Sequence, residues 1–257
     1  MPELPEVETL TRQLQAKISG RKILSSKVYD DKLAGIKNMR DRTIVTIERR
    51  GKTVNILLDD GNSISVHLRM TGRLLWQESP ERPKHGRWRI SFSDGNVFLV
   101  DPRRFGTVKI TKEVQTDSGR DLFGKFDLKS FIKNYGSRKT KIKSLIMDQR
   151  AISGIGNIYA CEILFRAEID PGRAAATLND DEWKKIFLHA RKILTVAIKN
   201  RGTSISDWRD LYGCKGENQY ELKVYGQGGK KCCSCGNDIV RIKQGGRGTF
   251  YCPNCQK

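Results

Sequence analysis

The first residues of the chain, Met-Pro-Glu, could supply an amine nucleophile. Removal of Met1 would expose the secondary amine of Pro2, with the carboxylates of Glu3 and Glu6 close by in the sequence. A free α-amine has a pKa of about 7.8, so about a third of it is unprotonated at about pH 7.5, against about a thousandth of a lysine side chain. A secondary amine that adds to an aldehyde-like carbon gives an iminium ion, which withdraws electrons. The alternative interpretation is that Pro2 and Pro5 only begin a helix.

Four of the seven cysteines have the spacing of a zinc site. Cys232 and Cys235 are separated by two residues, and after sixteen further residues Cys252 and Cys255 repeat that spacing. Zinc binds four ligands around one point, and each Cys-x2-Cys turn supplies two thiolates. We expect one structural Zn2+, because a module this small does not fold without a metal. Disulfides are the alternative, which the lack of an export signal disfavours.

The cysteine module is assigned to residues 221–257. Residues 239–243 and 249–251 are expected to form a hairpin turned by Gly-Gly-Arg-Gly at 245–248, which lifts Arg247 onto the tip. Cys233 is a rival ligand, but it breaks the two-residue spacing. Cys161 and Cys214 are expected to be ordinary thiols.

The charge of the chain predicts a polyanionic partner. Its 257 residues include 48 Lys and Arg against 29 Asp and Glu, a net charge of +19. Nucleic acid is favoured over an anionic membrane surface, because the basic residues do not gather on one amphipathic helix. No run approaches the roughly 18 apolar residues of a membrane span, and the N-terminus does not have the pattern of a signal peptide. We therefore expect a cytoplasmic protein with no membrane association.

The elements that must position these residues begin with a helix. Apolar residues recur at helical spacing between Val7 and Ile18, which predicts one amphipathic helix. From residue 23 to residue 110 the pattern changes to short alternating runs separated by turn residues, and this predicts several β-hairpins. The first domain, residues 1–112, is therefore expected to be an antiparallel sandwich or barrel.

A linker and a helical domain are expected to follow. The apolar pattern fades at 113–125, where Gln, Thr, Ser and Gly predict a linker. Residues 126–220 form the second domain, whose clearest helix ends at Asn200. Asn179 can cap this helix and Glu182 can reach back to it.

Four short motifs and the cysteine module occur together in one order. The motifs are MPELPEVET at the N-terminus, HLRMTG at 67–72, DPRRFG at 101–106 and GIGNIYACE at 154–162. In this combination nearly the whole chain resembles the bacterial formamidopyrimidine-DNA glycosylases. The resemblance implies an α+β protein: an N-terminal antiparallel β-sandwich with an N-terminal helix, a helix-two-turn-helix domain and a C-terminal four-cysteine zinc finger. It implies a base excision repair enzyme, expected to be a monomer, whose partner is damaged double-stranded DNA.

The resemblance implies catalytic roles for four residues. Pro2 matches the nucleophile that attacks C1′ of the damaged nucleoside, and Glu3 matches the acid that assists opening of the deoxyribose ring. Lys52 matches a catalytic lysine on a strand, assigned to proton transfer and phosphate contact, and Arg247 matches a finger-tip arginine that binds phosphates. One Schiff base would then lead from excision of an oxidised purine, 8-oxoguanine or formamidopyrimidine, to strand cleavage by β,δ-elimination.

The resemblance also assigns residues to DNA contacts. Five match contacts to phosphates or to the surroundings of the lesion: His85, Arg104, Lys139, Lys143 and Asn157. Three match side chains that fill the void left by an extruded base: Met70, Arg103 and Phe105. Such wedges are needed because extrusion costs a few kcal/mol. Arg103 facing the orphaned base would favour cytosine, whose acceptors suit a guanidinium. Taken singly, His85, Arg104, Lys139 and Lys143 could be solvated charges, and Met70 and Phe105 would more often be core side chains than wedges.

Two segments depart from the family pattern. HLRMTG has Arg69 where the family more often has Gly, and residues 212–221 match poorly the loop that closes over an extruded oxidised purine. The competing interpretations are an endonuclease VIII-like enzyme for oxidised pyrimidines, which typically begins PEGPE rather than PELPE, and a non-catalytic DNA-binding protein that senses damage. The second predicts a disrupted amine or acid, whereas the matching residues are present.

Overall fold

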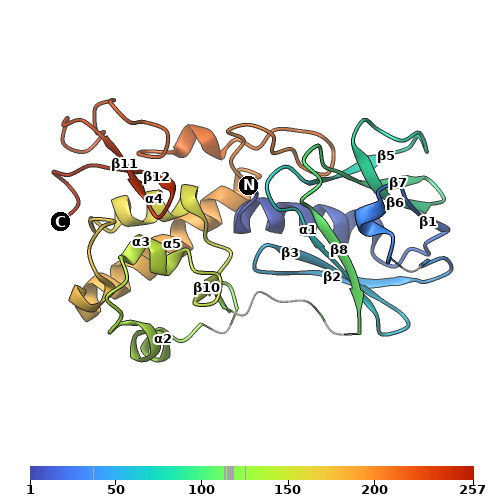
Figure 1. Ribbon diagram of the computed structural model, residues 1–257, viewed down its shortest axis with the longest axis horizontal. Helices are drawn as coiled ribbons and strands as arrows, with labels where there is room; N and C mark the ends of the chain where they lie inside the picture. The colour runs from blue at the N-terminus through green and yellow to red at the C-terminus, as the bar shows by residue number, and fades with distance from the viewer. Residues whose placement is uncertain (37, 113, 115–118, 125) are drawn as a thin grey trace. The chain divides into compact units, whose positions relative to one another are not determined.

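The chain divides into two compact units (Figure 1). The computed structural model describes residues 1–36, 38–112, 114, 119–124 and 126–257. The first unit comprises 1–117 and 198–219, and the second comprises 118–197 and 220–257. The expected linker falls partly outside the described residues, and within it Arg120–Asp121 forms strand β9. In the described part of the chain, no helix combines the length and apolarity needed to cross a membrane.

Helix α1 (Leu4–Ile18) opens the first unit. Its N-cap residue is Glu3, and Pro5 lies in the first turn, where a missing N–H costs nothing. The apolar face expected from the sequence is fully buried: Val7, Leu10, Leu14 and Ile18. After the helix the chain turns at Gly20, whose φ of +77° favours glycine.

Two antiparallel sheets of four strands make up most of the first unit. Their strand orders are β1-β6-β7-β5 and β2-β3-β4-β8. The strands are β1 (Ser25–Val28), β2 (Ile44–Arg50), β3 (Thr53–Leu58), β4 (Ser63–His67), β5 (Arg73–Gln77), β6 (Gly86–Phe92), β7 (Gly95–Val100) and β8 (Thr107–Thr111). Apolar residues of α1 and of both sheets form one core, with Leu14, Ile56 and Trp88 among them. The expected β-sandwich with an N-terminal helix is confirmed. A short 3-10 helix, Asp31–Leu33, lies between β1 and β2.

The second unit is mainly helical. Its helices are α2 (Leu128–Tyr135), α3 (Ile142–Ile146), α4 (Asn157–Arg166) and α5 (Asp180–Lys199), with a short 3-10 helix at Ala175–Thr177 and a parallel pair of β9 with β10 (Ile152–Ser153). Helix α5 begins as the sequence predicts: Glu182 N donates to Oδ1 of Asn179, and Asn179 N donates to Oε2 of Glu182, both at 2.9 Å. Phe131 of α2 packs edge-on against Phe187 of α5, with ring centroids 5.1 Å apart.

The C-terminal hairpin consists of β11 (Val240–Gln244) and β12 (Arg247–Tyr251), after a 3-10 helix at Asn218–Glu221. Its turn is only Gly245–Gly246, with φ of +56° and +76°, rather than the four residues expected. Two consecutive glycines adopt the positive φ values of a tight two-residue turn without strain. Arg247 is therefore the first residue of β12, directly after the turn.

Candidate active site and nucleic-acid interface

The N-terminal residues are fixed within the first unit. Pro2, Glu3 and Glu6 are buried, whereas Met1 is half exposed. Glu3 N donates to Oε2 of Glu6 at 2.7 Å, and Thr203 N donates to Oε1 of the same carboxylate at 2.7 Å. Glu6 thereby anchors the peptide that carries Pro2 and Glu3.

A glycine makes this anchor possible. Gly202 has a φ of +80°, and a Cβ at this position would lie 2.7 Å from Oε1 of Glu6. Any larger residue would therefore push away the carboxylate that holds the N-terminal peptide. Residues 202–203 come from the end of the chain's helical region in sequence, yet they belong to the first unit.

Lys52 is buried in the two-residue turn between β2 and β3, not on a strand. Arg49 supports this turn: its Nε donates to Oε2 of Glu8 in α1 at 2.8 Å, and its Nη1 donates to the carbonyl of Gly51 at 3.0 Å. Arg49 thus ties the Lys52 turn to α1. Local sequence patterns do not predict the pairing of Arg49 with Glu8, and the position of Arg49 within Glu-Arg-Arg-Gly-Lys was the available signal.

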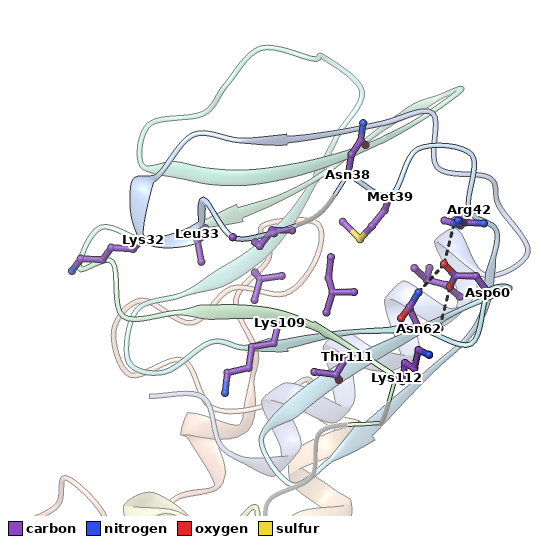
Figure 2. Close-up of a pocket in the computed structure, with 15 residues that line it drawn as sticks. Lys32, Leu33, Asn38, Met39, Arg42, Asp60, Asn62, Lys109, Thr111 and Lys112 are labelled. Atoms are coloured by element: carbon purple, nitrogen blue, oxygen red, sulfur yellow. Dashed lines mark hydrogen bonds and ion pairs between the residues drawn. The ribbon is translucent and has the colours of Figure 1, made fainter.

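A pocket of 720 Å3 opens elsewhere in the sandwich (Figure 2). Leu33 and Met39 contribute apolar side chains to its lining. Among its described lining residues the single carboxylate is Asp60, which pairs with Arg42 Nε at 3.0 Å and accepts the amide of Asn62 at 2.8 Å. None of the predicted site residues lines this pocket.

The three predicted wedge residues lie together on the surface. They come from two connections of the sandwich, residues 68–72 between β4 and β5 and residues 101–106 between β7 and β8. Arg103 Nη1 lies 3.9 Å from the sulfur of Met70, and its guanidinium lies 4.8 Å from the ring centroid of Phe105. All three side chains are exposed, so Met70 and Phe105 are not core residues.

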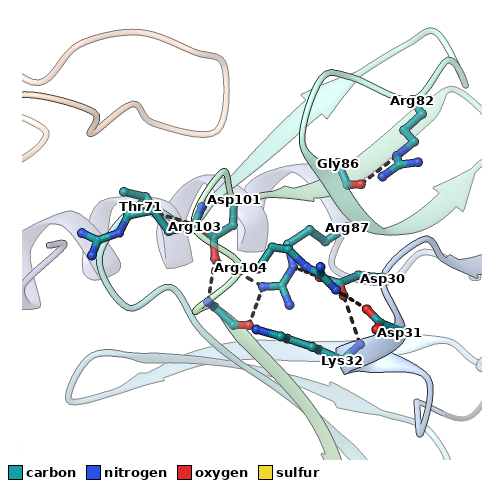
Figure 3. A network of polar contacts seen from close by, with 11 residues as sticks. Asp30, Asp31, Lys32, Thr71, Arg82, Gly86, Arg87, Asp101, Arg103 and Arg104 are labelled. Carbon is teal, nitrogen blue, oxygen red and sulfur yellow. Dashed lines mark hydrogen bonds and ion pairs between the residues drawn. The ribbon is translucent and has the colours of Figure 1, made fainter.

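His85 and Arg104 line one pocket of 450 Å3 beside these connections. Arg104 pairs with Asp30 and Asp31, and its Nε donates to Asp30 at 3.0 Å (Figure 3). The hydrogen bond from Arg104 holds the pKa of the Asp30 carboxyl well below its usual range. His85 is exposed, and its carbonyl accepts the N–H of Asp101 at 3.0 Å.

In the second unit, Asn157 is the first residue of α4. Its Oδ1 accepts Lys143 Nζ at 2.6 Å, and its Nδ2 donates to the carbonyl of Gly248 at 3.0 Å. Lys143 is buried and also donates to Oγ1 of Thr249 at 2.9 Å, so the pair joins α4 to the hairpin that carries Arg247. Both Arg247 and Lys139, which precedes α3, are exposed.

Two further residues of the second unit hold its loops, and neither was predicted from the sequence to have a role. Gln149 donates to the carbonyls of Met147 and Ile155 and accepts the N–H of Gly154, which closes the turn before α4. Glu162 of α4 accepts three consecutive backbone N–H groups, at 2.8–3.0 Å, from residues 223–225. Burial raises the pKa of its carboxyl. Glu162 lies within GIGNIYACE, so motif membership was the available signal.

The four cysteines fit one zinc ion. Their sulfurs all lie within 4.8 Å of one another, with Cys232 and Cys255 3.9 Å apart and Cys235 and Cys252 3.5 Å apart. A tetrahedron with Zn–S bonds of about 2.3 Å has edges of about 3.8 Å. The expected structural zinc site is therefore confirmed in its ligands. Cys233 is exposed and outside the set.

Comparison with known proteins matches three successive parts of the chain. Residues 1–108 match the formamidopyrimidine-DNA glycosylase N-terminal domain, residues 119–208 match its H2TH domain, and residues 229–257 match a zinc finger found in FPG and IleRS. The chain belongs to the formamidopyrimidine-DNA glycosylase family. It is 40% identical over 268 residues to the enzyme of Carboxydothermus hydrogenoformans, with 100% of both chains covered. It is also 40% identical to that of Pelotomaculum thermopropionicum, covering 100% of this chain and 99% of the relative.

Solved structures of the family agree with this fold. A mutant of the Lactococcus lactis FPG in complex with a Fapy-dG containing DNA has a TM-score of 0.91 at 34% identity, with 100% of both chains covered. The Lactococcus lactis Fpg with an abasic site containing DNA has a TM-score of 0.89 at 35% identity, with 99% of both chains covered. The predicted α+β class, with its helix-two-turn-helix domain and zinc finger, is confirmed.

Proposed function

We propose that the chain is a bifunctional DNA glycosylase and AP lyase that excises oxidised purines, 8-oxoguanine and formamidopyrimidines, from double-stranded DNA. The observation that carries the proposal is the fixed N-terminus. Pro2 and Glu3 are buried where α1 begins, and Glu6 accepts the N–H of Glu3 at 2.7 Å while its own carboxylate is held by the N–H of Thr203 at 2.7 Å. The Pro2 nitrogen becomes a nucleophile only after removal of Met1.

The reaction follows from an amine next to an acid. The lone pair of the Pro2 nitrogen attacks C1′, and the bond from C1′ to the base breaks, so that the base leaves with its electrons and takes up a proton. Glu3, in its protonated form, donates a proton to O4′ as the deoxyribose ring opens. The product is an iminium ion joining Pro2 to C1′. Base excision is complete at this point.

Strand cleavage uses the same intermediate. The iminium withdraws electrons, so a base can remove a proton from C2′ and the 3′ phosphate leaves with the electrons of its C–O bond. A second elimination releases the 5′ phosphate. Lys52 is the proposed proton carrier. Arg49 holds the β2–β3 turn that contains Lys52, because it donates to the carbonyl of Gly51. Hydrolysis of the iminium frees Pro2 for the next turnover.

DNA binding is assigned to residues of both units. His85 and Arg104 of the first unit, and Lys139 and Arg247 of the second, are exposed and are proposed to contact phosphates. Asn157 offers its amide and the N-terminus of α4. Buried Lys143 is proposed to act on DNA through Asn157. The zinc ion has a structural role, because four thiolates leave no open coordination position.

Oxidised pyrimidines are the second candidate substrate. A wild-type Lactococcus lactis FPG, 34% identical to this chain with a TM-score of 0.89, has been solved in complex with an oxidized pyrimidine containing DNA.

The proposed preference for cytosine opposite the lesion rests on Arg103, whose guanidinium donors suit the O2 and N3 acceptors of cytosine.

The test is borohydride trapping on duplexes that carry 8-oxoguanine, formamidopyrimidine or an oxidised pyrimidine. We expect a covalent adduct that peptide mapping places on Pro2, formed fastest with the two purine lesions. Pro2→Gly and a variant that retains Met1 should lose most trapping, whereas the matched control Pro80→Gly, at an exposed position, should not. Undiminished trapping in the first two variants would show that another amine reacts. Fastest trapping on the pyrimidine duplex would establish the second candidate.

We further propose that the enzyme acts as a monomer in the cytoplasm, associated with the nucleoid through DNA. Among the described residues, one wedge cluster and one four-cysteine site provide for one lesion at a time. Light scattering after size exclusion should give the mass of one chain, both alone and with one duplex bound. Twice that mass at micromolar concentration would contradict the monomer, and cell fractionation tests the location.

A further inference from the structure

We infer that Asp101 is a positioning residue that joins the two connections carrying Met70, Arg103 and Phe105 into one preassembled wedge. This inference rests on the void-filling role proposed for those three side chains. It concerns how the protein holds them before DNA arrives. Asp101 itself touches neither the lesion nor the reacting atoms in the proposed mechanism.

The first step is the hydrogen bonding of the Asp101 carboxylate (Figure 3). Its Oδ1 accepts the hydroxyl of Thr71 at 2.5 Å and the backbone N–H of Arg103 at 3.2 Å. Its Oδ2 accepts the backbone N–H of Gly106 at 2.7 Å and Nη1 of Arg87 at 3.3 Å. Four donors on two oxygens satisfy a carboxylate that is entirely buried.

The second step is where those donors lie in the sequence. Thr71 follows Met70 directly, Gly106 follows Phe105 directly, and the third donor is the N–H of Arg103 itself. The Asp101 carboxylate therefore accepts a hydrogen bond from each wedge residue itself or from the residue that directly follows it in the sequence. The exposed tips agree with this, because Arg103 contacts both of the other wedge side chains.

The third step is that the carboxylate is itself held. Arg87 is buried, donates to the carbonyl of Gly106 at 2.7 Å, and pairs with Asp30 as well as with Asp101. Asp30 in turn pairs with Arg104 of the same connection. A Cβ at Gly106 would lie 3.2 Å from Oδ2 of Asp101, a tight contact that would press on the carboxylate.

Backbone strain shows that these connections are tightly determined. Arg69 and Arg104, one in each connection, have φ of +56° and +57°, and neighbouring His85 has φ of +63°. Non-glycine residues hold left-handed conformations only where surrounding contacts compensate the cost. Because a wedge that is ordered in advance loses less freedom when it enters the duplex, the network should accelerate base extrusion.

The main test variant removes one hydrogen bond without creating a buried unpaired charge. Thr71→Val keeps the branched shape and loses the hydroxyl that Asp101 accepts. Single-turnover excision is measured on a duplex with 8-oxoguanine opposite cytosine, and cleavage on a duplex with a preformed abasic site. We expect Thr71→Val to slow excision about tenfold, as for a lost hydrogen bond to a charged group, and to change abasic cleavage less than about twofold. Thr71→Ser should restore excision.

A control variant, a second measurement and a second test variant make the result specific. Thr177→Val removes a hydroxyl that donates to the carbonyl of Ala174 at 2.8 Å in the second unit, and it should change neither rate. A 2-aminopurine beside an abasic analogue reports wedge insertion by its fluorescence, and Thr71→Val should reduce that change. Asp101→Asn, followed with a thermal melt, should show the same selectivity in its folded fraction.

The outcomes separate this inference from the proposed function. The positioning role would be overturned if Thr71→Val left the ratio of the two rates unchanged, whether or not both rates fell. It would also be overturned if Thr71→Ser failed to restore excision. Neither outcome would contradict the proposed activity of the enzyme. A wild-type protein that forms no borohydride adduct with either duplex would overturn the proposed function, and this inference with it.

Discussion

Truncation of the wedge should separate base extrusion from chemistry. Met70 and Phe105 are each 47% exposed, whereas Met39 and Phe98, which serve as matched controls in the same unit, are 3% and 0% exposed. Each residue is changed to alanine. The four variants therefore compare the same two side-chain types at the surface and in the core.

The expected magnitudes differ in both stability and rate. Deleting a buried methionine or phenylalanine costs about 2–5 kcal/mol, which lowers Tm by roughly 5–15 °C in a protein of this size. Deleting an exposed one changes stability by about 0.5 kcal/mol or less. Extrusion of a paired base costs a few kcal/mol, so a wedge residue that offsets about 1.4 kcal/mol of it accounts for about tenfold in rate.

The assay measures two single-turnover rates and one melt for each variant. Met70→Ala and Phe105→Ala should lose about tenfold in excision of a paired lesion, retain cleavage of a preformed abasic site within about twofold, and melt like the wild type. Met39→Ala and Phe98→Ala should melt earlier and show no such selectivity. Equal losses on both substrates in Met70→Ala and Phe105→Ala would refute the wedge assignment.

Three other changes test the zinc site, the buried ion pairs and the DNA contacts. Cys252→Ser should lose the single zinc ion seen by native mass spectrometry and unfold the hairpin, while Cys233→Ser should retain it; zinc loss in both would contradict the ligand set. Asp30→Asn should lower Tm at neutral pH. Because the folded pKa of Asp30 is depressed, its stabilisation is fully present above the unfolded value of about 3.9 and is lost progressively as the pH falls from that value through the folded pKa. The difference in Tm between the wild type and Asp30→Asn should therefore shrink between about pH 4 and about pH 2.5, and a constant difference would argue against the ion pair. Arg247→Ala should reduce the slope of log affinity against log salt by about 1 in fluorescence anisotropy, whereas Lys184→Ala, at an exposed position in α5, should keep the wild-type slope.

Local signals in the sequence were sufficient for several elements. The helical spacing of apolar residues predicted α1, and Asn179 with Glu182 predicted the start of α5. The two Cys-x2-Cys pairs predicted the zinc ligands. Each of these depends on residues a few positions apart, where helix, cap or turn geometry already determines which atoms meet.

The contacts that support the site could not be predicted in the same way. Arg49 meets Glu8 across 41 positions of the sequence, Thr71 meets Asp101 across 30, and Arg87 meets Asp30 across 57. Such pairs depend on sheet order and register, which single-sequence patterns do not specify. The length predicted for the turn between β11 and β12 was also too large, because strand pairing continues up to Gly245 and Gly246.

Arg87 in β6, and Arg103 and Arg104 in the connection between β7 and β8, show why composition alone could not identify the groups proposed to face DNA. Arg87 is buried between two carboxylates, Arg104 is half exposed and paired with Asp30, and Arg103 is exposed and contacts the other wedge side chains. All three count equally toward the net charge of +19. A buried guanidinium that is neutralised by carboxylates, such as that of Arg87, contributes little to the electrostatic field that attracts DNA. It does, however, fix the loop that carries the exposed guanidinium of Arg103. We therefore propose that Arg87 only holds the loop, that Arg103 meets DNA and that Arg104 does both, and it is the burial and the acidic partners of each arginine in the fold that distinguish these roles.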